Sequence, residues 1–418
     1  MLPRAALRCA ALGAALIGVW ILAADAGAAD WIEYHEVSGR LSVDGRWYPQ
    51  SAAHAGQRDH ASGIVLAPKL YVEAADGASL TLEAFWRFDG ADPQRTHADL
   101  REAYLLFYGA AGDDEWELRL GIDRVFWGVA ESRHLVDIVN QTDLVEHPNE
   151  KAKLGQPMVH LTWSGEWGVA ELFGLPYHRQ RTDPGRHGRL RTAYLVDSGR
   201  AAYESAADEW RLDLAARYSH SVGPFDVGVS VFDGTGREPA LLPDVDRRGL
   251  PILIPHYEQI RQIGLDAQLT SGPWLWKLEA IRRTGARNLL GMEEDYAAFV
   301  AGGEYALYSL FDSDIDLTLI GEWNRDGRRE RATNVFQNDV FVGARLAFND
   351  VEGTDLIVGM LEDADLGTRS LSAEMNRRLS DAWSMHLEAV LFSDVDRADP
   401  AYQTRRDSFV EMSLIYSF

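Results

Sequence analysis

Segments in which apolar and polar side chains alternate recur along most of the chain. The segment 80–88, LTLEAFWRF, places Leu80, Leu82 and Trp86 on one face and Glu83 and Arg87 on the other. Comparable segments lie at 116–122, 210–218, 274–280, 340–348 and 383–391. A period of two is typical of a β-strand that has one face in an apolar medium and the other in water. The chain is therefore predicted to be all-β.

The side chains on the two faces favour a closed membrane barrel over a soluble sandwich. The apolar face is rich in Leu, Val and Ala, with aromatic residues near strand ends, and the opposite face carries charges of both signs. Aromatic side chains gather at the two lipid–water boundaries of membrane barrels. Because every backbone group must find a partner inside a bilayer, such a sheet has to close. The segments predict a closed antiparallel transmembrane β-barrel of about 18 strands, with 16 as the alternative count.

The predicted connections between these strands alternate between short turns and longer loops. The longest loops lie at about 129–155, 178–207 and 236–256. Membrane barrels have short turns at the periplasmic end and longer loops outside the cell. An even number of strands would leave both ends of the barrel domain in the periplasm.

The N-terminal stretch, residues 1–29, is predicted to be a secretory signal peptide. Arg4 and Arg8 precede an apolar run, and the following Ala26-Gly27-Ala28 fits the rule for a small-residue cleavage site. The remaining residues, 30–418, show no linker or helical repeat and are predicted to form one barrel domain. The single cysteine, Cys9, lies in the signal, so no disulfide or cysteine-bound metal is expected. No cofactor is expected either. A net charge of −23 argues against binding to nucleic acid.

The chain ends on an alternating strand, VEMSLIYSF, in which Val410, Met412 and Leu414 precede Tyr416 and the final Phe418. This stretch resembles the C-terminal signature of outer-membrane β-barrels of Gram-negative bacteria. The resemblance implies an outer-membrane location, contact with outer-membrane lipid and lipopolysaccharide, and recognition of Tyr416 and Phe418 by the barrel-assembly machinery.

A second resemblance lies at Gly121–Asp143, GIDRVFWGVAESRHLVDIVNQTD. It is similar to a segment of uncharacterised porin-like barrel proteins of proteobacteria, in which a strand ending in Trp-Gly leads into an Asp-Ile-x-Asn-Pro-x-Asp loop. Trp127-Gly128 and Asp137-Ile138-Val139-Asn140 match that pattern, whereas Gln141 stands where the family tends to have proline.

Charged side chains in the alternating segments are predicted to line the interior, because an Arg or Lys facing lipid at mid-depth costs roughly 2–4 kcal/mol. A barrel of this size is too wide for side chains alone to fill, which favours a hydrated channel whose charges select solutes. The alternative is that acids and arginines pair across strands and fill the lumen. The predicted pore-lining residues are Glu83, Arg87, Glu117, Arg119, Asp123, Arg211, Asp213, Arg217, Lys277, Glu279, Arg345 and Arg378.

Two of the predicted loops have unusual compositions. The loop 129–155 has apolar patches, which suit either a constriction loop folded into the lumen, with Asp137, Asn140 and Asp143 near the narrowest point, or a surface loop packed on its neighbours. The loop 178–191 is basic and suggests contact with lipopolysaccharide phosphates, a funnel for anionic solutes, or simply a solvated loop. Its arginines are Arg179, Arg181, Arg186, Arg189 and Arg191.

These observations predict a porin-like channel for passive diffusion of small polar or charged solutes, and no enzyme. One alternative is a transporter of hydrophobic compounds with a lateral gap or a small plug formed by residues 31–40. Another is a barrel with a structural or export role in the envelope. The identity of the solute, the ion preference and the formation of a homo-oligomer are left open by the sequence.

Overall fold

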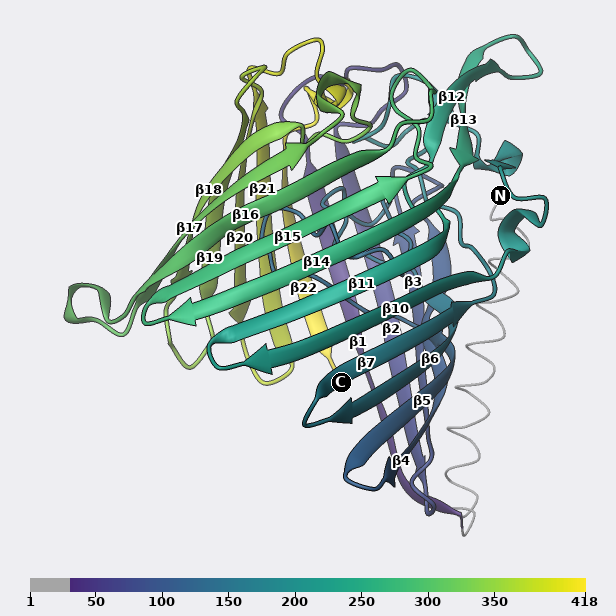
Figure 1. The fold of residues 1–418 in the computed structure, drawn as a ribbon. Coiled ribbons are helices and arrows are strands. Elements are labelled where there is room, and N and C mark those ends of the chain that lie inside the picture. The colour runs from purple at the N-terminus through teal and green to yellow at the C-terminus, as the bar shows by residue number, and fades with distance from the viewer. Residues whose placement is uncertain (1–30) are drawn as a thin grey trace.

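The computed structural model describes residues 31–418, so the predicted signal peptide lies outside the described residues. Eighteen strands form one sheet, shown in Figure 1. The first nine are β1 (Ile32–Trp47), β2 (His60–Ala74), β3 (Ser79–Asp89), β4 (His97–Ala111), β5 (Asp114–Asp123), β6 (Gln156–Gly165), β7 (Gly168–Leu175), β10 (Asp213–Val222) and β11 (Phe225–Thr235). The others are β14 (Gln259–Ser271), β15 (Trp274–Thr284), β16 (Tyr296–Leu307), β17 (Asp316–Asp326), β18 (Asn338–Ala347), β19 (Asp355–Asp363), β20 (Arg369–Arg378), β21 (Trp383–Ser393) and β22 (Phe409–Ser417).

Each of these strands pairs in antiparallel fashion with the strands that precede and follow it around the sheet, and β22 returns to pair with β1. The closing register runs from Arg40 opposite Ser417 to Trp47 opposite Val410. Beyond it, the N–H of Gly39 donates to the Phe418 carbonyl at 2.9 Å, and the N–H of Phe418 donates back at 3.0 Å. A Cβ on Gly39 would lie 2.7 Å from Pro68 Cα, so the close approach requires glycine. The predicted closed barrel and the count of eighteen strands are confirmed.

The connections differ in length at the two ends of the barrel, as predicted. At one end lie turns such as 112–113, 166–167 and 272–273, and β1 begins and β22 ends there. At the other end lie the long loops 124–155, 176–212 and 236–258. A small second sheet within these loops contains β8 (Leu195–Val196), β9 (Ala202–Tyr203), β12 (Ala240–Val245) and β13 (Pro251–Tyr257), and its β12–β13 hairpin projects beyond the barrel (Figure 1).

The outer surface of the barrel is apolar along its middle and aromatic toward both ends. On β11, Val227, Val229 and Val231 are exposed, whereas Ser230 and Phe232 between and beyond them face inward and are buried. Exposed aromatic side chains at the short-turn end include those of Trp274, Trp276 and Trp383; at the long-loop end they include those of Trp47, Phe88 and Trp323. This distribution matches the aromatic belts of a membrane barrel.

Among the described residues, helical structure is confined to short 3₁₀ segments: η1 (Ser198–Arg200), η2 (Asp208–Trp210), η3 (Leu310–Asp312), η4 (Arg329–Arg331) and η5 (Pro400–Thr404). Within residues 31–418, no helix is both long enough and apolar enough to cross a membrane.

Candidate functional site

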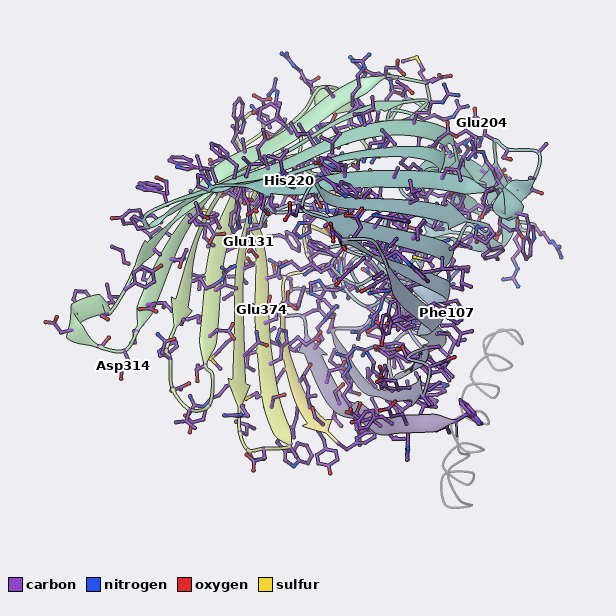
Figure 2. All side chains as sticks on the ribbon, turned by 60° about the horizontal axis from the view of Figure 1, so that its bottom comes forward. Phe107, Glu131, Glu204, His220, Asp314 and Glu374 are labelled. Carbon is purple, nitrogen blue, oxygen red and sulfur yellow. The ribbon has the colours of Figure 1, made fainter. Side chains whose placement is uncertain are left out.

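The loop 124–155, between β5 and β6, lies inside the barrel. Figure 2 shows Glu131 of this loop within the ring of strands, near Glu374 of β20 in this view. Asp314, by contrast, lies at the tip of a turn outside the ring. The apolar side chains of the loop pack against the inner wall. The buried cluster joins Trp127, Leu135, Val136, Ile138 and Val139 of the loop to Phe173, Phe232, Ile260, Ile281, Tyr296 and Val300 of the strands. The apolar patches in the sequence are thus the contact surface of a loop folded inward.

Two carboxylates of the wall hold the first half of this loop. Glu279 of β15 accepts hydrogen bonds from the N–H groups of Val129 at 2.7 Å, Ala130 at 3.0 Å and Val136 at 3.3 Å. Glu322 of β17 accepts from the N–H groups of Glu131 and Ser132, both at 2.8 Å, and from the Ser132 hydroxyl at 2.6 Å. Each carboxylate replaces the backbone partners that an irregular loop segment lacks.

The rest of the loop reaches other parts of the wall. Arg345 of β18 forms an ion pair with Glu131 at 2.7 Å, and His147 contacts Glu388 of β21 at 2.8 Å. On the side of β3, Arg87 binds Glu146 at 2.6 Å. Charged contacts on β3, β15, β17, β18 and β21 therefore fasten the loop across the lumen.

The three residues predicted at the narrowest point have different surroundings. Asp137 forms an ion pair with Lys153 at 3.1 Å, and its burial raises the pKa of its carboxyl. Asn140 fixes the path of the loop, since its amide donates to the carbonyls of Asp123 and Leu154 and accepts from the N–H of Val125. Both line the large cavity described below.

The third of these residues, Asp143, is fully buried and belongs to an internal network. It accepts hydrogen bonds from Arg101 at 2.6 Å and Thr182 at 2.7 Å and contacts His97 at 3.2 Å. Although burial opposes ionisation, the hydrogen bond from His97 and the charge of Arg101 hold the pKa of Asp143 well below its usual range. Asp143 therefore ties the loop to β4 and to the neighbouring basic loop.

Gln141 explains how the loop is fixed without the proline of the similar segment. Its side chain is fully buried, donates to the carbonyl of Arg179 at 3.1 Å and accepts from the N–H of Thr142 at 2.9 Å. The preceding strand ends at Asp123, so Trp127-Gly128 lies in the loop and not at a strand end.

A cavity of about 740 Å³ lies beside the loop. The loop forms one wall, including Asp137, Asn140 and Lys153, and the inner faces of β18 to β21 contribute to the opposite one. That opposite wall has an apolar strip made by Phe341, Ile357, Leu361, Val390 and Phe392, beside the acids Glu374 and Glu388. The sequence analysis did not predict this strip. Segment 355–363, DLIVGMLED, is apolar on both faces, and this pattern could have indicated an apolar patch on the inner wall.

The structure places eleven of the twelve predicted pore-lining residues on the inner side of the sheet; the exception is Arg211. Many of them are paired: Arg217 with Asp266 at 2.7 Å, Arg119 with Asp123 at 3.0 Å, and Lys277 with Glu304. The eleven residues on the inner side are Glu83, Arg87, Glu117, Arg119, Asp123, Asp213, Arg217, Lys277, Glu279, Arg345 and Arg378.

Arg211 precedes β10 at the rim of the barrel. It contacts Asp213 and the outward-facing Asp233, because β10 begins three residues after the start of the alternating segment 210–218.

Most arginines of the basic loop 178–191 form hydrogen bonds or ion pairs with other residues of the protein. Arg189 is buried and binds Asp407 at 2.7 Å and Asp59 at 3.0 Å, and Arg179 binds Asp99 at 2.8 Å. Arg191 donates to the carbonyls of Thr192 and Ala193, Arg181 lies 3.6 Å from Asp183, and Arg186 is exposed. Most of this positive charge thus connects loops to one another.

Comparison with known proteins gives similarity of structure only. No family model and no curated protein sequence matches the chain. Among solved structures, a BenF-like porin from Pseudomonas fluorescens Pf-5 matches with a TM-score of 0.49 and 11% identity, over 93% of this chain and 99% of that one. An anion-selective porin from Comamonas acidovorans gives a TM-score of 0.43 and 12% identity, over 92% and 99% of the two chains. A mutant Rh. blastica porin gives 0.43 and 10%, over 92% and 100%. At these identities and TM-scores, the comparison gives no information on solutes.

Proposed function

We propose that the protein is an outer-membrane channel through which small polar or charged solutes diffuse passively. The observation that carries this proposal is the loop 124–155, which is fastened across the lumen of a closed barrel and leaves a cavity of about 740 Å³ beside it. Charged groups that line a lumen select solutes by sign, and a loop that narrows the lumen limits their size.

The outer surface supports a membrane location. Its apolar middle and its two aromatic belts suit a bilayer, and the closed sheet leaves no unpaired edge. With the terminal strand, these features favour the bacterial outer membrane, with Tyr416 and Phe418 as the assembly signal. In the basic loop, the exposed Arg186 is the side chain best placed to meet a lipopolysaccharide phosphate.

The test is conductance of the refolded mature protein in a planar bilayer under a salt gradient. Stable open steps are expected, and Glu374→Gln should move the reversal potential toward anion selectivity, because Glu374 lines the cavity. Asp381→Asn removes the same charge from an exposed turn at the short-turn end and should change little. A folded barrel that stays electrically silent would contradict the channel.

A second candidate, uptake of hydrophobic compounds, is favoured by the apolar strip that includes Phe341, Leu361 and Phe392. Liposomes containing the protein separate the two functions. A channel admits small hydrophilic solutes in proportion to their size, whereas a transporter of this kind admits apolar solutes, and Phe341→Asp would abolish its uptake.

A further inference from the structure

A small pocket at the long-loop end of the barrel is separate from the large cavity. It lies where the end of β1 meets four connections: the loop 48–59, the loop 90–96, residues 144–145 of the inward loop and the segment 184–190. Arg46, Arg58, Arg95 and Arg189 are the cationic side chains of its lining, and Asp89 and Asp92 are the anionic ones. Its volume of about 30 Å³ is room for roughly two water molecules. The pocket therefore takes one or two oxygen atoms of a small polar group.

Two buried arginines of this pocket have unused hydrogen-bond donors. Arg46 contacts Glu411 through Nε, and Arg95 donates through Nε to the Val145 carbonyl at 2.9 Å and through Nη1 to Asp89 at 3.0 Å. Within residues 31–418, the Nη2 atoms of both guanidinium groups are buried and have no hydrogen-bond partner. A buried charged donor without a partner has lost its hydration and gained no hydrogen bond in return, so a ligand that accepts these bonds would be bound favourably.

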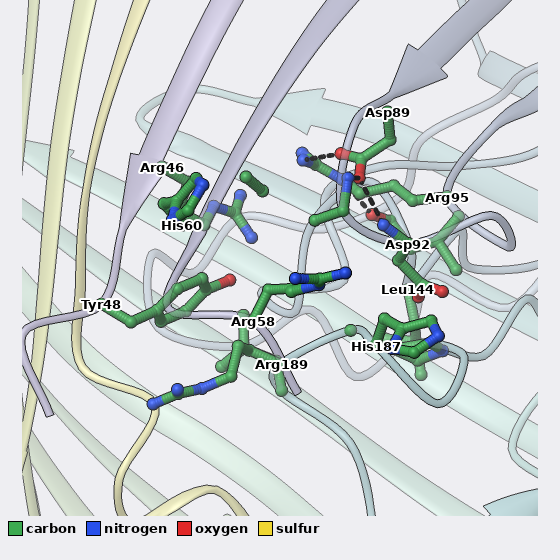
Figure 3. Close-up of a pocket in the computed structure, with 16 residues that line it drawn as sticks. Arg46, Tyr48, Arg58, His60, Asp89, Asp92, Arg95, Leu144, His187 and Arg189 are labelled. Atoms are coloured by element: carbon green, nitrogen blue, oxygen red, sulfur yellow. Dashed lines mark hydrogen bonds and ion pairs between the residues drawn. The ribbon is translucent and has the colours of Figure 1, made fainter. Parts of the chain in front are cut away.

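A third arginine of the pocket, Arg58, is exposed, and no ion pair of its side chain is formed among the described residues. In Figure 3 its side chain extends between Tyr48 on one side and Asp92 and Arg95 on the other. Its backbone is fixed, because the N–H of Arg58 donates to the carbonyl of His187 at 3.0 Å. Arg58 thus presents an uncommitted guanidinium from a positioned segment.

The two acids of the lining are already engaged. Asp89 accepts hydrogen bonds from the N–H groups of Ala91 at 2.8 Å and Asp92 at 2.7 Å, in addition to Arg95. Asp92 accepts from the N–H of Gly185 at 2.6 Å. The carboxylates of Asp89 and Asp92 thus accept hydrogen bonds from the turns around the pocket. The buried side-chain groups of the pocket that have no partner among the described residues are the Nη2 donors of Arg46 and Arg95.

We propose that this pocket binds a small oxyanion, a carboxylate, phosphate or sulfate group, between Arg58 and the free Nη2 atoms of Arg46 and Arg95. Guanidinium groups bind planar and tetrahedral oxyanions through paired N–H donors. Arg46 and Tyr48 face inward and are buried, whereas Trp47 between them is exposed on the outer surface. The oxyanion therefore reaches the site from the mouth of the barrel, and a lipid phosphate does not.

The experiment uses selenate, whose selenium can be located by anomalous diffraction in crystals of the refolded protein. A selenate ion is expected in the pocket, and binding in detergent solution should weaken about tenfold in Arg58→Ala, as the loss of a charged hydrogen-bond partner implies. Arg58 is exposed, so the variant should fold. Arg248→Ala removes the same charge from the exposed β12–β13 hairpin and should leave selenate binding unchanged.

Three results would overturn this site: absence of selenate from the pocket, equal weakening in both variants, or unaltered binding in Arg58→Ala. Retention of lipopolysaccharide by protein extracted from outer membranes separates the two sources of oxyanion. If Arg58→Ala lowers lipopolysaccharide retention while selenate binding is unchanged, the pocket serves lipid and the proposal is wrong. Selenate binding does not require conduction, so this test is independent of the channel function.

Discussion

Glu279 on β15 provides a direct test of how the inward loop is held. The Glu279→Ala variant removes the acceptor of three hydrogen bonds, from the N–H groups of Val129, Ala130 and Val136. Hydrogen bonds to a charged group contribute about 1.5–3 kcal/mol each. Three bonds at the lower end of this range give about 4–5 kcal/mol, which is a large part of what fixes this segment.

The expected result is local release of the loop within a barrel that stays closed. Because each 1.4 kcal/mol is a factor of ten in an equilibrium, protection of these three amides from hydrogen exchange should fall by roughly a thousand-fold. Single-channel recordings should show larger and noisier steps. Glu279→Gln keeps an acceptor oxygen without the charge, and should fall between the wild type and the alanine variant.

Glu117→Gln is the matched control, since Glu117 also faces inward but contacts Arg119 at 3.5 Å and does not touch the loop. Its hydrogen-exchange pattern at 129–136 should equal that of the wild type. If Glu279→Ala also leaves the protection of those amides unchanged, the carboxylate is not what holds the loop and the reasoning fails.

Three further predictions concern the loops and the terminal strand. Burial raises the pKa of the Glu258 carboxyl, which precedes β14, to about 7. The folded state therefore binds this proton more tightly than the unfolded state does. The contribution of the protonated carboxyl to the stability of the fold is complete below pH ~4.5, declines as the pH rises and is lost above about 7. Proteolysis of the β12–β13 hairpin should thus be faster at pH 8 than at pH 5, and Glu258→Gln should abolish the difference. Arg189→Ala leaves Asp407 buried without its cation, at a cost of about 3–5 kcal/mol, and should expose loop 394–408 to protease, whereas Arg397→Ala in the same loop should not. Phe418→Ser retains the backbone bonds to Gly39 and should reduce assembly in cells while refolding in detergent, read by heat-modifiability on a gel, proceeds normally.

The fold follows from the sequence to a large extent because its determinants are local. Alternation with a period of two fixes which side chains share a face, and consecutive strands pair with each other through short turns. Segment 80–88 therefore predicted both a strand and the inward direction of Glu83 and Arg87. Strand ends are less certain, since alternation continues past the last paired residue; this is why Arg211 was placed in the lumen when it lies at the rim.

Only the tertiary structure determines where the loops lie and which side chains they contact. The composition of segment 129–155 was compatible with two positions, and its partners, such as Glu279, Glu322 and Arg345, come from strands that are distant in the sequence. The same holds for Arg189, which looked like a surface charge and is buried against Asp407. The alternation of apolar and polar residues along a strand reflects the medium on each side of that strand. Ion pairs across the lumen depend instead on which strands the curvature of the sheet brings face to face. The sequence by itself determined the barrel and its faces, and closure of the barrel determined what fills its lumen.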